Sequence, residues 1–133
     1  MARIPPGART DPGALSPRRL LIAFGYAWEG LVYTWREQPN FRVEVGIGAL
    51  ALGLAAVLGV SPVPVLLAVG LVLGLELLNT GVEALVDLAS PEPHPLAKAA
   101  KDAAAAAVLV ASAAALAVGL LVFLPPLWRL VAR

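Results

Sequence analysis

The sequence predicts an all-α integral membrane protein, in which an amphipathic amino-terminal surface helix precedes three transmembrane helices. Its 133 residues are 59% hydrophobic and 14% charged, whereas about 25% of the residues of soluble domains are charged. A soluble domain of this size buries too little surface to hide so many apolar side chains. The long apolar runs lack the two-residue alternation of strands, and helices satisfy their own backbone hydrogen bonds in lipid.

Three apolar segments are long enough to cross a bilayer, which takes about 20 helical residues. Residues 45–75 and 103–128 contain no charged side chain. A stretch rich in turn residues, 59–64, divides the first of these regions. The third span is expected to end at the pair Pro125-Pro126. The predicted spans are residues 43–60, 63–88 and 103–124.

Residues 16–38 are predicted to form a helix that lies in the membrane interface. Ser16 suits the N-cap of this helix and Pro17 its first turn. At 3.6 residues per turn, its large apolar side chains share one face, which either enters the headgroup layer or packs on protein. That face consists of Leu20, Phe24, Trp28, Leu31 and Trp35. The preceding residues 1–15 are predicted to be a disordered tail, and residues 16–133 a single membrane domain.

The positive residues predict how the chain lies across the membrane. Only Arg129 and Arg133 follow the third span, whereas the other arginines and the lysines precede the first span or lie between the second and third. Because positive residues favour the cytoplasmic side, the amino terminus and the 87–102 loop are expected in the cytoplasm. The predicted location is therefore the cell membrane, crossed several times.

Composition also excludes several partners and chemistries. The net charge of +1 provides no basic surface for nucleic acid. The chain has no cysteine, which excludes disulfides and thiolate zinc sites. The third span is rich in alanine, and small residues let membrane helices approach closely. Three spans form a thin bundle whose acidic groups need cover from lipid, so a homo-oligomer is predicted.

The most informative segment is a polar face within the second span. On a helical wheel, Glu76, Asn79, Glu83 and Asp87 fall on one side, with Glu76 about 10 Å of helix rise deeper than Glu83. An acidic residue in mid-membrane costs at least about 2.5–3.5 kcal/mol on insertion scales. This polar face is therefore expected to be functional, although a seam that only fixes helix register is the alternative.

The polar face carries the groups that phosphate chemistry requires. A carboxylate held away from water, as Glu76 is expected to be, can act as a general base. Glu83, nearer the cytoplasm, can bind Mg²⁺, which takes one or two carboxylates together with substrate phosphates. Asn79 can position a hydroxyl or a phosphate oxygen, and Lys101 can neutralise phosphate charge. These groups predict a site where ATP meets a lipid headgroup.

Three neighbouring residues also have simpler explanations. Lys101 could be a flanking lysine whose ammonium group reaches the interface. Asp102 could cap the third span at its positive end. His94 has no partner ligands nearby in the sequence, so it is expected in a surface loop.

The sequence resembles the prokaryotic diacylglycerol kinase family, which includes the undecaprenol kinases, over about residues 19–110. The resemblance rests on three motifs, which are Glu76-x-x-Asn79-Thr-x-x-Glu83-Ala-x-Val86-Asp87, Ser90-x-Glu92-x-His94 and Ala100-Lys101-Asp102. It implies a homotrimer of three-span subunits that transfers the γ-phosphate of ATP, with Mg²⁺, to a membrane lipid alcohol.

The resemblance also implies roles for individual residues. Glu76 would be the general base and Asn79 would lie near the reacting groups. Glu83 would bind the metal, and Trp35 together with Glu76 would meet the lipid substrate. The residues implied at the nucleotide are Arg19, Tyr26, Glu83, Glu92, His94, Lys101 and Asp102.

One position departs from the family pattern. Members often carry a metal-binding glutamate three residues before a Phe-Arg pair, and here that position, before Phe41-Arg42, is Gln38. Either the adjacent Glu37 takes over as a metal ligand, or the second ligand is neutral.

The acceptor and the reaction class each have a second candidate. Asn40-Phe41-Arg42 and the segment 90–98 look more like the Gram-positive type, in which undecaprenol is the usual acceptor, so undecaprenol is favoured over diacylglycerol. The alternative function is a small proton- or ion-translocating membrane subunit that uses Glu76.

Overall fold

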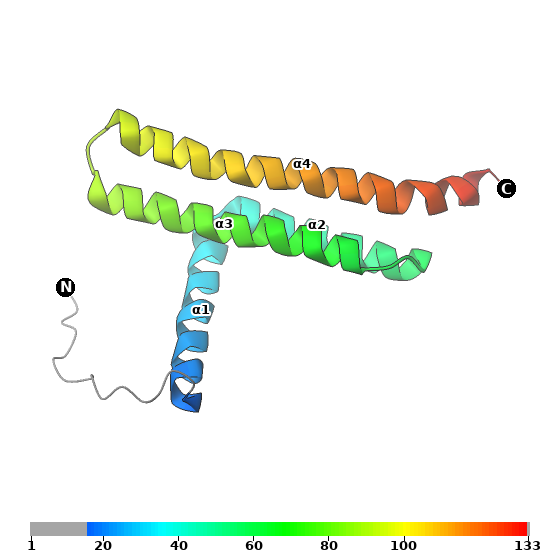
Figure 1. The fold of residues 1–133 in the computed structure, drawn as a ribbon, viewed down its shortest axis with the longest axis horizontal. Helices are drawn as coiled ribbons and strands as arrows, with labels where there is room; N and C mark the ends of the chain where they lie inside the picture. The colour runs from blue at the N-terminus through cyan, green and yellow to red at the C-terminus, as the bar shows by residue number, and fades with distance from the viewer. Residues whose placement is uncertain (1–15, 133) are drawn as a thin grey trace. The chain divides into compact units, whose positions relative to one another are not determined.

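The computed structural model describes residues 16–132 and contains four helices (Figure 1). No strand occurs in this part of the chain, which confirms the all-α prediction. Three of the helices are long and apolar enough to cross a membrane, as the charge-free segments predicted. The tail predicted over residues 1–15 lies outside the described residues. The helices are α1 (Pro17–Glu37), α2 (Pro39–Leu58), α3 (Val63–Ala89) and α4 (Pro95–Val131).

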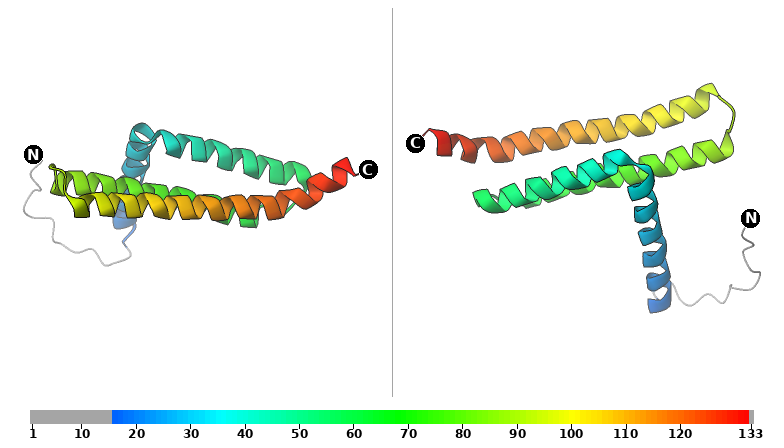
Figure 2. Two further views of the ribbon diagram at one scale, coloured as in Figure 1. Left: turned by 90° about the horizontal axis from the view of Figure 1, so that it is seen from above. Right: turned by 180° about the vertical axis from the view of Figure 1, so that it is seen from behind.

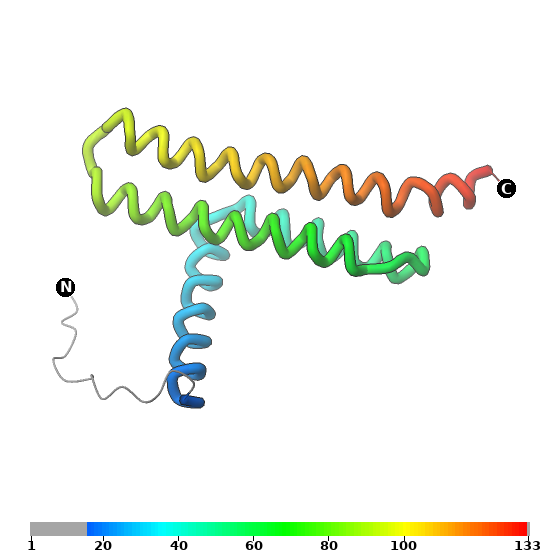
Figure 3. The backbone as a smooth tube through the Cα atoms, viewed as in Figure 1, coloured from blue at the N-terminus to red at the C-terminus, as the bar shows by residue number. Residues whose placement is uncertain are grey.

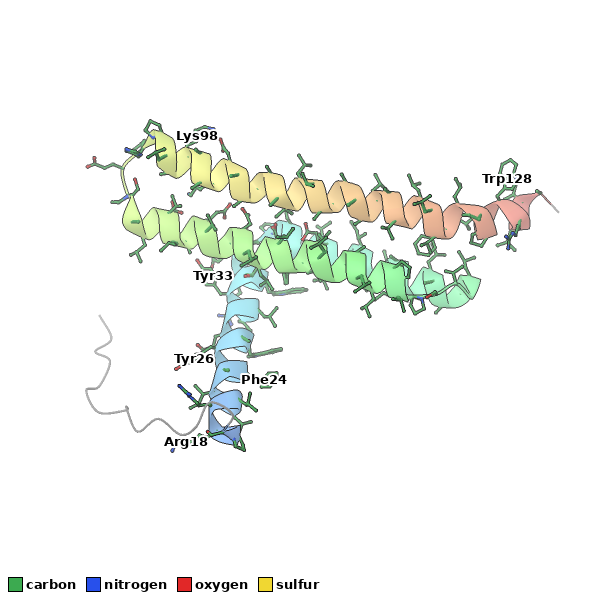
Figure 4. The ribbon with its side chains drawn as sticks, in the orientation of Figure 1. Arg18, Phe24, Tyr26, Tyr33, Lys98 and Trp128 are labelled. Carbon is green, nitrogen blue, oxygen red and sulfur yellow. The ribbon has the colours of Figure 1, made fainter. Side chains whose placement is uncertain are left out.

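The chain divides into two compact units, with the boundary between Tyr33 and Thr34. The first unit contains most of α1, which begins where the sequence predicts, because the Arg19 amide donates to the Ser16 hydroxyl oxygen at 3.3 Å. Phe24 and Tyr26, labelled in Figure 4, are about 70% exposed. These side chains therefore find no cover within their own unit.

The second unit consists of two helical hairpins. The α2–α3 turn is made by Gly59, whose φ of 64° lies in the left-handed region and whose amide bonds back to the carbonyls of Ala55 and Ala56. Glycine suits this position because it carries no Cβ. Residues 90–94 then join α3 to α4, and these two helices run side by side along their length (Figures 1 and 3).

Helix α2 packs against α3 where Gly48 faces Val69. A Cβ added at Gly48 would stand 2.8 Å from Val69 Cγ1, so only glycine allows this approach. Few apolar side chains are buried in the described residues, and many leucines of the three long helices are exposed. This distribution is what lipid-facing helices require, because lipid replaces water around them.

Helix α4 differs from the predicted third span. It begins eight residues earlier, at Pro95, and passes through Pro125 and Pro126 to Val131. The helix therefore continues past the proline pair at which the predicted third span ends. A proline removes one backbone hydrogen bond and bends a helix. In α4, apolar residues on both sides of the proline pair keep the helix continuous. Its last turns bend away from the line of the preceding turns in Figure 2.

The helix starts also differ from the predicted limits of the first and third spans. Helix α2 begins at Pro39 and not at residue 43, because proline suits the first helical position even where polar residues follow it. In α4 the cap is His94, whose Nδ1 accepts the Leu96 amide at 3.2 Å. Asp102 lies in the second turn beyond that cap and does not cap the helix.

Candidate functional site

The deeper part of the polar face of α3 is buried, although the unit around it is small. Glu76, Asn79 and Thr80 are 3%, 7% and 4% exposed, and with Thr34 they are the buried polar residues of the described chain. The Thr80 hydroxyl donates to the Glu76 carbonyl at 2.9 Å, so its own polar group is satisfied within the helix. Glu76 and Asn79, two of the four residues predicted to share one face, are thus both buried, whereas Asp87 is exposed.

Glu83 is held by two amides, one on either carboxylate oxygen. Gln38 Nε2 donates to Glu83 Oε2 at 2.8 Å, and Asn79 Nδ2 lies 3.4 Å from Glu83 Oε1. The Gln38 contact joins the start of α2 to α3 across 45 residues of sequence. Helical spacing brings Asn79 to Glu83, but the Gln38 contact depends on how the two helices cross.

Glu44 is a third member of the acidic group, and sequence reasoning missed it. Glu76 is close enough to both Glu44 and Glu83 for their charges to interact, and we call these three residues the carboxylate cluster. Glu44 Oε2 is buried without a hydrogen-bond partner. The signal was its place within the helix that begins at Pro39, whereas in the sequence it marks only the edge of a charge-free run.

The oxygen atoms at the carboxylate cluster are suitable ligands for a hard cation. Asn79 Oδ1 is buried and has no partner, while its amide nitrogen contacts the Glu83 carboxylate. Carboxylate and amide oxygens are the ligand types that Mg²⁺ accepts. Among residues 16–132, no three histidine, cysteine, aspartate or glutamate side chains are grouped so as to hold a metal together. The chain therefore offers a partial set of ligands.

Glu37, the predicted alternative metal ligand, is not brought to Glu83. It is the last residue of α1 and is exposed, whereas the adjacent Gln38 makes the contact. The local backbone explains the choice, because Gln38 leaves the helix with φ −110° and ψ 102°. Trp35, the predicted lipid contact, packs edge-on against Phe41 with ring centroids 6.4 Å apart and remains 46% exposed.

A pocket of about 600 Å³ lies at the α3–α4 corner, and the polar residues of its lining include Glu92, His94 and Lys101. Lys101 Nζ donates to Asp87 Oδ1 at 2.6 Å, and Lys98 pairs with Asp102 one turn along α4. Three of the four residues predicted at the nucleotide in this region thus line one pocket, and Asp102 joins it through Lys98. Glu92 and His94 are exposed.

An apolar groove of about 590 Å³ runs between α2, α3 and α4. Glu44 is the acidic residue of its lining, and the rest is almost entirely aliphatic, from Ile47 to Leu127. The carboxylate cluster is therefore continuous with a surface suited to a hydrocarbon chain.

Arg19 and Tyr26 belong to the other unit. Both lie on α1 and are exposed. Their proposed contact with a nucleotide stays a prediction.

The fold and the site together define a membrane protein with a buried Glu76 in its second long apolar helix and a pocket at the α3–α4 corner. Residues 25–123 match the model of the prokaryotic diacylglycerol kinase family, and the chain belongs to this family. It is similar to the diacylglycerol kinase of Synechocystis sp., with 42% identity over 91% of this chain and 77% of that protein. It is also similar to the undecaprenol kinase of Bacillus subtilis (39%, over 82% and 91%) and to the diacylglycerol kinase of Escherichia coli K12 (38%, over 70% and 79%).

Membership in this family resolves the class of protein. The chain is a multi-pass membrane enzyme, a lipid kinase, and kinases use ATP. The alternative of an ion-translocating subunit is thereby replaced. The identities of 42% and 39% to a diacylglycerol kinase and an undecaprenol kinase are too close together to choose the acceptor.

Proposed function

We propose that this kinase transfers the γ-phosphate of ATP to the hydroxyl of a membrane lipid at the cytoplasmic interface, and that undecaprenol is preferred to diacylglycerol. The observation that carries the proposal is the buried Glu76, whose charge interacts both with Glu44, at the apolar groove, and with the amide-held Glu83. A lipid alcohol can approach Glu76 from one side and a phosphate from the other.

Glu76 acts as the general base. Its carboxylate takes the proton of the lipid hydroxyl as that oxygen attacks the γ-phosphorus, and the bond from phosphorus to the bridging oxygen of ADP breaks. ADP leaves with the electron pair of that bond. Burial of Glu76 at 3% exposure keeps water from competing as acceptor. The neighbouring Asn79 positions the reacting oxygens.

Mg²⁺ fits beside the carboxylate cluster, where Glu83 and the unpartnered Asn79 Oδ1 would hold it. When bound, Mg²⁺ neutralises the charge that develops on the phosphate oxygens. Glu37 is the less suitable ligand, because its side chain is exposed and Gln38 occupies the contact with Glu83.

The nucleotide binds at the α3–α4 corner. Lys101 supplies positive charge to the phosphates, and Asp102 keeps Lys98 in place through their ion pair. Glu92 and His94 frame the same pocket. Arg19 and Tyr26 are the proposed nucleotide contacts from α1.

The acceptor lipid lies with its hydroxyl at the carboxylate cluster and its tail in the apolar groove. The groove has aliphatic walls and suits the single prenyl chain of undecaprenol, whereas diacylglycerol must place two acyl chains. The motif at Asn40-Phe41-Arg42 favours the same acceptor. Trp35, half exposed next to Phe41, is the proposed contact with the lipid headgroup region.

Two assembly properties belong to the same proposal. The positive residues favour a cytoplasmic amino terminus and a cytoplasmic α3–α4 corner. The exposed aliphatic face and the alanine-rich α4 favour a homotrimer, in which neighbouring helices cover aliphatic surface that one chain leaves exposed.

The acceptor assay tests this function directly. The purified chain is reconstituted with ATP labelled in the γ-phosphate and with undecaprenol or diacylglycerol at equal mole fraction. The expected result is labelled lipid with both acceptors and a higher kcat/KM for undecaprenol. Equal or reversed values remove the acceptor preference, and no labelled lipid with either acceptor removes the proposed reaction.

A further inference from the structure

Gln38 contacts Glu83 only as a neutral hydrogen-bond donor. Its Nε2 occupies Glu83 Oε2 at 2.8 Å, and the Asn79 amide faces the other oxygen at 3.4 Å. Both donors supply partial positive charge where a bound cation would supply a full one. Glu83 is therefore oriented by two neutral amides before any metal arrives, and Gln38 adds no carboxylate beside it.

The corner between α1 and α2 fixes Gln38 in place. The Gln38 amide donates to the Thr34 carbonyl at 2.9 Å. Arg42 Nη1 donates to the Trp35 carbonyl at 2.8 Å and lies 3.4 Å from the Arg36 carbonyl. These bonds satisfy carbonyls at the end of α1, which the helix itself leaves unpaired. The side chain of Gln38 is thus directed by backbone that is held on both sides.

The ligand count then determines when a metal can bind. Mg²⁺ requires six oxygen ligands at close to octahedral geometry and dehydrates reluctantly. No group of three acidic or histidine ligands exists among the described residues. Glu83 and Asn79 Oδ1 provide one full charge and one amide oxygen. Within one chain, the remaining ligands and most of the charge would come from the phosphates of ATP and from water.

We propose that Gln38 is a positioning residue that makes divalent-metal binding depend on the nucleotide, so that the free enzyme holds no metal at Glu83 and acquires it with the polyphosphate. The proposal rests on the proposed function. Because Gln38 donates to Glu83, replacement by glutamate would place two carboxylates together, and a cation between them would then be bound without ATP.

The test measures metal binding without turnover. Mn²⁺ replaces Mg²⁺, and free Mn²⁺ is followed by electron paramagnetic resonance with the full chain in detergent, with and without a non-hydrolysable ATP analogue. A mixture of wild-type protein and analogue is expected to bind Mn²⁺ at least about tenfold more tightly than the protein alone or the analogue alone. This factor is within the usual range of coupling between two ligands. Gln38→Glu is expected to bind Mn²⁺ without the analogue.

Glu37→Gln is the matched control, because Glu37 is adjacent and exposed, and it should behave as the wild type. Equal Mn²⁺ affinity of the wild type with and without the analogue would overturn the proposal and leave the kinase function intact. Failure of Gln38→Glu to bind Mn²⁺ alone, while it still binds with the analogue and is therefore folded, would also overturn it. Absence of binding in every condition would instead remove the metal site of the proposed function.

Discussion

Lys101 and Asp87 join the carboxyl end of α3 to the first turns of α4 by a 2.6 Å hydrogen bond between Nζ and Oδ1. Their side chains are 36% and 66% exposed, and exposed ion pairs of this kind contribute about 0–1 kcal/mol. The pair is therefore weak enough for a phosphate group to displace Asp87 from Lys101.

Asp87→Asn should lower the KM for ATP by up to about fivefold, which corresponds to about 1 kcal/mol of competition removed from Lys101. Thermal stability should change little, because the pair is exposed. Initial rates over a range of ATP concentrations test this. Lys101→Ala is the opposing control and should raise the KM, whereas a raised KM in Asp87→Asn would mean that Asp87 itself contacts the nucleotide.

Glu76→Gln should reduce kcat by about 10²–10⁴-fold, the usual loss on removing a general base. The amide keeps the shape of the side chain, so the oligomer should survive. Turnover is measured in vesicles at saturating ATP and lipid. Glu29→Gln, a change on the exposed surface of α1, is the control, and wild-type turnover in folded Glu76→Gln would refute the assignment.

Glu44→Gln should raise thermal stability and lower kcat. Glu44 Oε2 is buried without a partner, and leaving such a group unsatisfied costs about 1–3 kcal/mol, more when it is charged. Removal of its charge from beside Glu76 should relieve that cost and disturb the reaction at the same time. Unfolding in detergent and turnover are measured on the same preparation, and a stabilised variant with full activity would place Glu44 outside the site.

Gly48→Ala should destabilise the contact between α2 and α3 by about 1–3 kcal/mol, as overpacking does. The added Cβ would meet Val69 Cγ1 at 2.8 Å, and β-branched valine turns poorly about χ1. The double variant with Val69→Ala should recover most of the loss. Gly46→Ala has nothing within 4 Å and should not destabilise, so equal effects at Gly46 and Gly48 would contradict this packing.

Mixed oligomers of Glu76→Gln and Lys101→Ala should regain part of the lost activity if neighbouring subunits complete each other's sites. One thin chain leaves most of its aliphatic surface exposed, which favours such sharing. The two inactive variants are dissociated, mixed and reassembled, and exchange is verified with two affinity tags. Exchange without recovered turnover would assign each site to one chain.

Periodicity predicted the part of the site that lies on one helix. Asn79 and Glu83 are four residues apart and contact each other, because helical spacing places them one turn apart on one side of α3. The buried Glu76 lies one turn before Asn79 on the same helix. The three spans followed similarly from hydropathy, because lipid tolerates few charges. The roles of these residues in catalysis stay predictions.

Contacts between helices could not be read in the same way. Gln38 meets Glu83 and Asp87 meets Lys101 only because of where each helix begins and how it crosses its neighbour. In the sequence, Glu44 lies at the edge of the predicted first span. In the structure it lies in the second turn of α2, because that helix begins at Pro39. Helix α4 continues through Pro125 and Pro126 because apolar residues flank them. The expectation that a proline pair ends a helix takes no account of such neighbours.

The length of α4 relates the enzyme to the thickness of its host membrane. Lys98 and Trp128 lie at opposite ends of this helix (Figure 4), about 45 Å apart at 1.5 Å per residue, and a bilayer with its headgroups is about 40–45 Å thick. A lysine and a tryptophan at such a separation anchor to opposite interfaces. In a thinner bilayer the helix must tilt, and that tilt would move the α3–α4 corner, so acyl-chain length becomes a physical variable of catalysis.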